Sequence, residues 1–212
     1  MDYLSNVILE ISILALPVLV AITFHEVAHG YVAYLLGDPT ARDQGRLSLN
    51  PLKHLDPVGT LVFITTRMIG WAKPVPVDPR YFKHPRQGMM WVAVAGPAMN
   101  IVLAGFFSVC HQLLPQSTSA SPDSLYVMVI TPIIIMVRYC IMINVGLAVF
   151  NMIPIPPLDG GRILNGILPA EYARSYSKVE PYGFLIIIAL LFSGVIHDTI
   201  IPTIRFLNSL FV

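Results

Sequence analysis

Long apolar stretches constrain this chain more than any other feature of its sequence. Residues 7–24, VILEISILALPVLVAITF, form one of several such stretches. A run of about 18 or more apolar residues with few charges predicts a helix that crosses a membrane. Charged residues make up 12% of the chain, against about 25% in an ordinary globular domain. We therefore expect an all-α polytopic membrane protein rather than a soluble domain with one buried helix.

About four membrane-crossing helices are expected within a single integral membrane domain over residues 1–212. Gly37-Asp38-Pro39 is a typical helix stop and ends the first of them. The predicted segments are a helix over 6–36, a polar loop over 37–87, helices over 88–114 and 124–151, a proline-rich segment over 152–162 and a helix over 182–209.

Three parts of the loop over 37–87 have features of their own. GRLSLN (45–50) alternates polar and apolar residues, and KPVPVDP (73–79) has valines two apart between prolines, which predicts a small β element with an edge strand. Such an edge could pair with an extended peptide, or be a solvated hairpin that only covers a site. VGTLVFITTRMIGW (58–71) is too short to span comfortably and suggests a re-entrant or interfacial piece.

The distribution of Lys and Arg predicts the orientation of the chain. Eight of the 13 fall between Arg42 and Arg86, and three more lie at positions 162, 174 and 178. Because cytoplasmic loops carry the excess of basic residues, loops 37–87 and 159–181 are expected on the cytoplasmic side. The N-terminus and the 115–124 connection are expected on the outer side.

The remaining composition excludes other classes of protein. The net charge is +1 and no basic run suggests nucleic-acid binding. Cys110 and Cys140 both lie in apolar stretches, so they predict neither a disulfide framework nor a cysteine-rich zinc site.

The segment TFHEVAHG (23–30) places two histidines four residues apart with a glutamate between them. On a helix, His25 and His29 project from one face and can hold one metal ion, while Glu26 can reach a metal-bound water. This spacing is typical of zinc hydrolases. Two core histidines that share a face are the alternative. Histidine and glutamate inside a membrane helix are costly, however, which favours a functional site.

A catalytic zinc usually takes three protein ligands. By the predicted topology, His111 and His197 lie near the outer side, and His54 and His84 lie in the cytoplasmic loop. Asp159 is the better candidate because prolines break the chain before it, and broken backbone at membrane depth is buried in protein or lines a water-filled cavity. The same segment, PIPPLDGG, also suits an ordinary cytoplasmic turn.

Three segments together resemble the site-2 protease family of intramembrane metalloproteases: HEVAHG (25–30), AGPAMNIVLA (95–104) and FNMIPIPPLDGGR (150–162). Two parts of the loop, over 45–60 and 70–79, are similar to the compact bacterial and archaeal branch. The resemblance implies that His25, His29 and Asp159 bind Zn²⁺ and that Glu26 activates water. It also implies that Asn151 holds the substrate carbonyl or its oxyanion.

The implied function is hydrolysis of peptide bonds in or near transmembrane segments of membrane proteins, with regulated release of membrane-anchored factors. A transmembrane protein substrate and the lipid bilayer of a prokaryotic cell membrane are the expected partners. Larger members carry a PDZ or CBS domain; given the short outer connection and the end at Val212, neither is expected here. A zinc-binding or transport protein without hydrolysis is the alternative, but a ligand cage has no need of Glu26.

Three further polar residues are candidate supports of the site. Asn100 shares a small-residue face with Gly96 and Ala104, which favours close helix packing over contact with the site. Asn144 either supports the ligands indirectly or bonds another helix. His54 is interpreted as a solvated loop histidine, or as a residue near the mouth of the site.

Glu10 and Arg138 are charges within apolar helices at similar predicted depths and could pair. Asp198 competes as a partner for Arg138. The sequence indicates neither the substrate nor the oligomeric state.

Overall fold

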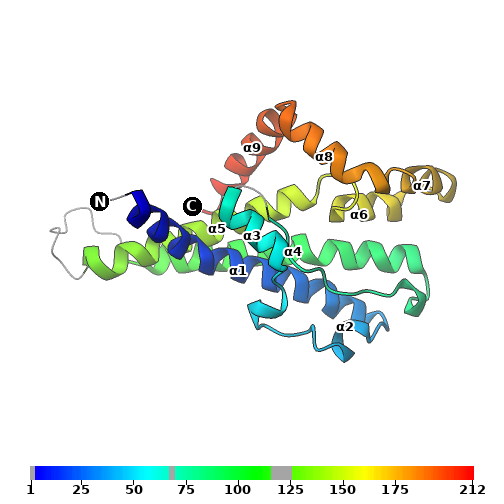
Figure 1. Cartoon of the computed structure of the whole chain (residues 1–212). Helices are drawn as coiled ribbons and strands as arrows, with labels where there is room; N and C mark the ends of the chain where they lie inside the picture. The colour runs from blue at the N-terminus through cyan, green and yellow to red at the C-terminus, as the bar shows by residue number, and fades with distance from the viewer. Residues whose placement is uncertain (1–2, 67–69, 116–125) are drawn as a thin grey trace.

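The computed structural model describes residues 3–66, 70–115 and 126–212, with only the backbone described for 3–11, 63 and 66. Helices dominate the described chain (Figure 1). The longer ones are α1 (Tyr3–Leu35), α3 (Pro57–Thr66), α4 (Pro85–Leu113), α5 (Thr131–Asn151), α6 (Asp159–Ile167), α7 (Ala170–Ser177), α8 (Gly183–Phe192) and α9 (Val195–Asn208). The short turns are α2 (Thr40–Asp43), η1 (Pro51–Lys53), η2 (Pro79–Tyr81), η3 (Tyr126–Ile130) and η4 (Glu180–Tyr182).

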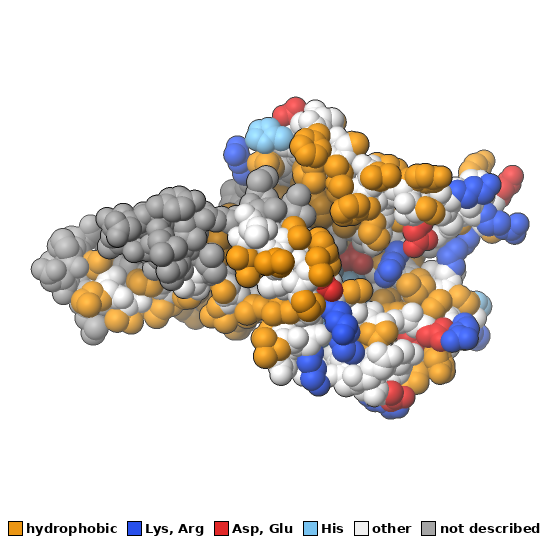
Figure 2. Space-filling view, viewed as in Figure 1, with side chains coloured by type: hydrophobic (Ala, Val, Ile, Leu, Met, Phe, Trp, Pro, Cys, Tyr) orange, Lys and Arg blue, Asp and Glu red, His pale blue; other side chains and the backbone are white. Residues whose placement is uncertain are grey.

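Four helical stretches are long and apolar enough to cross a membrane: Ser12–Leu35, Pro85–Leu113, Tyr126–Asn151 and Ala170–Phe192. The prediction of a helical polytopic membrane protein with about four spans is therefore confirmed. Figure 2 shows hydrophobic side chains gathered over α3 and α8, with Lys and Arg around α2 and α7.

Helix α4 lies at the centre of the packing, because it contacts α1, α5 and α6 (Figure 1). Small side chains let these helices approach closely, as is usual where no hydrophobic force drives helix association. Ala104 of α4 is fully buried against Ile141 and Val145 of α5. At the other end of α4, Val92 packs with Ala33 of α1 and Phe82.

The prediction of a small β element is wrong for the described residues, which contain only one isolated bridge, between Leu55 and Ala72. The prolines of KPVPVDP explain this result, because a proline has no N–H to give to a ladder. Of the remaining N–H groups, that of Lys73 makes the single bridge bond, to the His54 carbonyl at 2.9 Å, whereas Val75 donates to Glu26 and Asp78 to Asp38. The segment is thus an extended strap tied to its surroundings rather than a strand.

Buried Asp38 anchors one end of this strap, defined here as residues 73–78. Its carboxylate accepts hydrogen bonds from the N–H of Asp78 at 2.7 Å and from the N–H of Thr40 at 2.9 Å. Asp78 itself accepts hydrogen bonds from the Arg80 side chain, which lower its pKa and keep its carboxylate charged. Arg46 holds the other end by donating to the Lys73 carbonyl at 2.8 Å.

The predicted re-entrant or interfacial piece overlaps α3, which has ten residues and is about 15 Å long, too short to cross a bilayer. It exposes Val58, Leu61 and Ile64. An apolar surface of this kind suits the membrane interface, and that location stays a prediction. Residues 67–69 of the piece lie outside the described residues.

The structure divides the predicted helix over 182–209 into α8 and α9, which meet at a bend (Figure 1). Ser193 ends α8, and Gly194 has a φ of +83°, a conformation that a helix cannot contain. The residues before this predicted helix are also largely helical, in α6, α7 and η4, and the fourth candidate span is Ala170–Phe192. A run of apolar residues gives no sign of where a helix turns, and the one signal here was Ser193-Gly194.

Candidate active site

Three side chains from distant parts of the sequence meet at one point. His25 and His29 lie one turn apart on α1, and Asp159 is the first residue of α6. The Nε2 atoms of the two histidines are 3.0 Å apart, and Asp159 Oδ2 lies 3.2 Å from His25 Nε2 and 3.4 Å from His29 Nε2. Each side chain is 12% exposed or less, so water does little to separate them.

A chain of buried amides fixes the proton on His25. The Cys140 carbonyl can only accept, so the hydrogen bond at 2.8 Å from Asn144 must use its Nδ2. Asn144 Oδ1 then faces Asn100 Nδ2 at 2.8 Å, which turns Asn100 Oδ1 toward His25 Nδ1 at 2.6 Å. His25 therefore carries its proton on Nδ1 and leaves the lone pair of Nε2 free.

A single contact gives His29 the same tautomer as His25. Its Nδ1 donates to the carbonyl of Val92 at 2.7 Å, so its Nε2 also keeps a lone pair. A histidine that binds metal commonly has its other ring nitrogen oriented in this way.

The site thus gathers three acceptors with no donor between them, and buried Asp159 Oδ2 has no hydrogen-bond partner among the described residues. Three lone pairs this close repel one another unless a cation lies among them. In a tetrahedral zinc site with bonds of 2.0–2.1 Å, ligand atoms are about 3.3 Å apart. The observed separations of 3.0–3.4 Å and the His₂Asp set fit a zinc ion with a position left for water.

Two glycines make room for the site. A Cβ on Gly96 of α4 would lie 2.5 Å from His25 Cε1 and from His29 Nε2, so only glycine lets α4 press against the histidine pair. A Cβ on Gly160 would lie 2.3 Å from the carbonyl oxygen of Met152. Glycine there lets the chain after α5 fold back and present Asp159.

Glu26 lies beside the histidine pair, on the same helix. Its Oε2 accepts a hydrogen bond from the N–H of Val75 at 2.9 Å, while Val75 itself is only 8% exposed. The strap therefore crosses α1 at Glu26, the residue predicted to activate water. Sequence reasoning missed this contact because it uses the backbone, although the lone N–H between Pro74 and Pro76 was a visible signal. Sequence reasoning also missed the hydrogen bond from His29 to the Val92 carbonyl, which uses the backbone and leaves no pattern in the sequence.

The structure brings some of the other predicted site residues together and leaves others apart. Asn100 and Asn144 join His25, so Asn100 contacts the site as well as packing α4. Asn151 ends α5 with its Nδ2 donating to the Leu147 carbonyl at 3.0 Å, and it has no hydrogen bond to the three ligand residues. His54 is fully buried rather than solvated, and its Nε2 donates to the Ser48 carbonyl at 2.7 Å within the loop.

Several known proteins are similar to this chain in sequence. The description "Peptidase family M50" matches residues 119–194, which include Asp159. "Putative zinc metalloprotease YwhC" of Bacillus subtilis is 40% identical over 181 residues, which cover 84% of this chain and 78% of that protein. "Putative zinc metalloprotease Rip2" of Mycolicibacterium smegmatis is 30% identical over 84% of this chain and 66% of that protein. "Zinc metalloprotease MJ0392" of Methanocaldococcus jannaschii is 24% identical over 95% of this chain and 47% of that protein. No solved structure matches the chain.

The chain belongs to peptidase family M50, the site-2 protease family. This membership confirms the predicted resemblance and, with it, a zinc metallopeptidase of the intramembrane type. A zinc-binding or transport protein without hydrolysis is not favoured.

Replacing Gly96 by Ala should lower zinc affinity by at least about 10-fold, because the new methyl group displaces both histidines. Zinc content after dialysis against a graded chelator measures the effect. Gly146→Ala on α5 is the matched control, since its Cβ meets nothing within 4 Å. Equal zinc retention by both variants would show that the α4 contact does not shape the site.

Proposed function

We propose that His25, His29 and Asp159 hold the zinc ion of this peptidase and that Glu26 moves the protons during peptide hydrolysis. The observation that supports this most is that three lone-pair atoms, from His25, His29 and Asp159, converge without a donor among them. Glu26 lies on the same helix as the two histidines. The same helix is a candidate membrane span, so the substrate bond is expected in or near a transmembrane segment of a membrane protein.

When bound, zinc supplies Lewis acidity, which makes water a usable nucleophile near neutral pH and polarises a peptide carbonyl. Glu26 takes the proton from the attacking water and later gives it to the leaving amine. A carboxylate performs this role best when it is held still, and the Val75 N–H holds Oε2 at 2.9 Å. The other carboxylate oxygen, Oε1, would then take the proton.

Asn100 and Asn144 act indirectly. Together with the Cys140 carbonyl they keep the His25 proton on Nδ1, and the Val92 carbonyl does the same for His29. These groups orient the ligands and raise their basicity.

Asn151 is proposed to hold the substrate carbonyl or its oxyanion. It is the last residue of α5 and begins the segment that leads to Asp159, the first residue of α6. Its Nδ2 donates to the Leu147 carbonyl at 3.0 Å. Substrate binding would replace that bond with one to the carbonyl oxygen of the peptide.

The proposed orientation of the chain in the membrane rests on the distribution of its basic residues. The basic residues of the loop over 37–87 and of α6–α7 favour an active site toward the cytoplasmic side of a cell membrane. Reporter fusions within the loop over 37–87 and in the connection after α4 check this orientation.

Replacing Glu26 by Gln should leave zinc content unchanged and lower peptide cleavage by at least about 100-fold, because the amide cannot accept the proton. Zinc analysis and cleavage of a transmembrane peptide by the purified protein measure the two quantities. Glu171→Gln on exposed α7 is the control and should cleave normally. Full activity in Glu26→Gln would refute the mechanism.

Replacing Val75 by Pro removes the N–H that holds Glu26 while keeping an extended backbone. Hydrogen bonds to charged groups contribute about 1.5–3 kcal/mol, so kcat should fall about 10-fold to 100-fold with zinc content unchanged. Val75→Ala keeps the N–H and separates this effect from lost packing. The positioning role fails if the alanine variant loses as much kcat as the proline variant.

Replacing Asn151 by Ala should lower kcat by about 100-fold while KM changes little, because a donor to the oxyanion acts mainly in the transition state. Steady-state kinetics on the same peptide measure both constants. Asn165→Ala on α6 is the control, because the Asn165 side chain donates to Ser177 of α7 rather than facing the ligands. A rise in KM without loss of kcat would assign Asn151 to substrate binding alone.

A further inference from the structure

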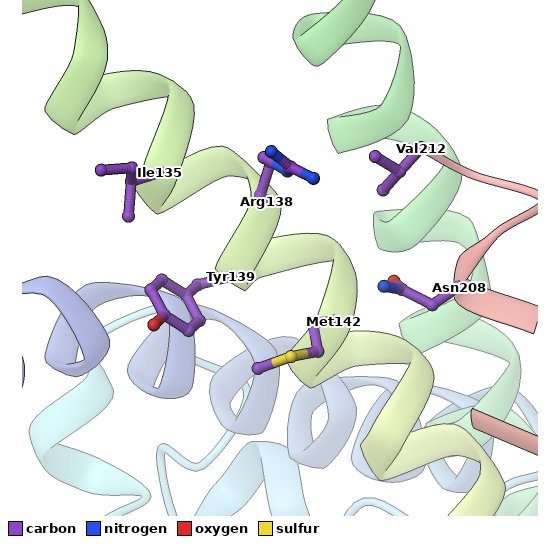
Figure 3. A pocket seen from close by; sticks show the side chains of 6 residues that line it. All are labelled: Ile135, Arg138, Tyr139, Met142, Asn208 and Val212. Carbon is purple, nitrogen blue, oxygen red and sulfur yellow. The ribbon is translucent and has the colours of Figure 1, made fainter. Parts of the chain in front are cut away.

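A cavity of about 290 Å³ lies between α5 and the last residues of the chain, apart from the active site. Figure 3 shows Arg138 of α5 and Asn208 of α9 pointing into the same space. The lining combines apolar side chains with polar ones: Ile135, Met142 and Val212 with Arg138, Tyr139 and Asn208.

Arg138 carries a charge within a candidate membrane span, Tyr126–Asn151. It is exposed and has no hydrogen bond or ion pair with any described residue. The predicted partner Asp198 lies toward the other end of α9, ten residues or about 15 Å from Asn208. The side chain of Glu10 lies outside the described residues. An isolated cation in a span is costly, so an anion is expected beside it.

Asn208 lines the same cavity as Arg138. Its Oδ1 is fully buried, so a ligand in the cavity cannot reach that atom, and Arg138 is the charged group that the lining offers. The cavity therefore suits a ligand with an anionic group for Arg138 and an apolar part for Ile135 and Met142.

The depth of the cavity can be derived from the contact of Asn144 with Asn100, which puts these residues at one level. Arg138 is six residues beyond Asn144, about 9 Å, and Leu113 is 13 residues beyond Asn100, about 20 Å. Arg138 is thus about 10 Å from the level where α4 ends. Its long side chain covers much of that distance, which brings it within reach of lipid headgroups.

We propose that this cavity binds an anionic phospholipid such as phosphatidylglycerol. The phosphate pairs with Arg138, and an acyl chain lies against Ile135 and Met142. The cavity is too small for a second helix, whose diameter is about 10–12 Å. Lipid is also the molecule that surrounds an exposed face of a spanning helix.

Native mass spectrometry of the purified full chain in detergent, titrated with phosphatidylglycerol, phosphatidic acid or phosphatidylcholine, tests the proposal. Wild type should retain phosphatidylglycerol at least about 10-fold better than phosphatidylcholine. Arg138→Gln should abolish this preference. Phosphatidic acid, which is also anionic, should be retained at least as well as phosphatidylglycerol. Arg205→Gln, an exposed arginine of α9, is the control and should bind as wild type does.

Arg138→Lys keeps the charge and should keep the preference, which separates lost pairing from misfolding. Equal retention of the three lipids by wild type, or an unchanged preference in Arg138→Gln, would overturn the proposal. Tighter binding of oleate or of an acidic transmembrane peptide than of phosphatidylglycerol would also overturn it, because the cavity would then be a carboxylate site.

Discussion

The repulsion among three lone pairs is the constraint on which the rest of this structure depends. His25 Nε2, His29 Nε2 and Asp159 Oδ2 lie within 3.4 Å of one another with no proton to share. Helices α1 and α6 must therefore be held together at a point where their side chains repel. Both helices pack against α4. This packing keeps them together, as does the turn of the chain between α5 and α6. A cation removes the repulsion.

The buried amides near the site contribute specificity more than stability. A hydrogen bond contributes only about 0.5–1.5 kcal/mol net, so Asn100 and Asn144 are a weak means of joining helices. Their value is that each has a donor and an acceptor end, so one backbone carbonyl, that of Cys140, sets the direction of the whole chain of bonds. A leucine at either position could pack as well but could not choose the tautomer of His25.

Much of the fold and of the candidate metal site could be predicted from the sequence because both depend on local patterns. Apolar length indicates spans, and the i, i+4 spacing of His25 and His29 indicates one ligand face. Asp159 needed the resemblance as well, since a proline-rich turn that ends in Asp-Gly-Gly is ambiguous alone. The predictions failed where backbone groups determine the local structure. The alternating valines of the strap predicted a strand, yet its prolines leave no ladder, and the bend at Gly194 interrupts an otherwise uniform apolar run.

The strap also shows why a backbone contact would suit Glu26 as the proposed catalytic base. Pro74 and Pro76 remove the neighbouring N–H groups, so the N–H of Val75 has no competing ladder to join. Glu26 receives a donor that cannot titrate and that cannot swing away as a side chain would. Asp38 and Arg46 fix the two ends of the strap to the segment that follows α1, so the orientation of the Glu26 carboxylate depends on groups more than ten residues away from it in sequence.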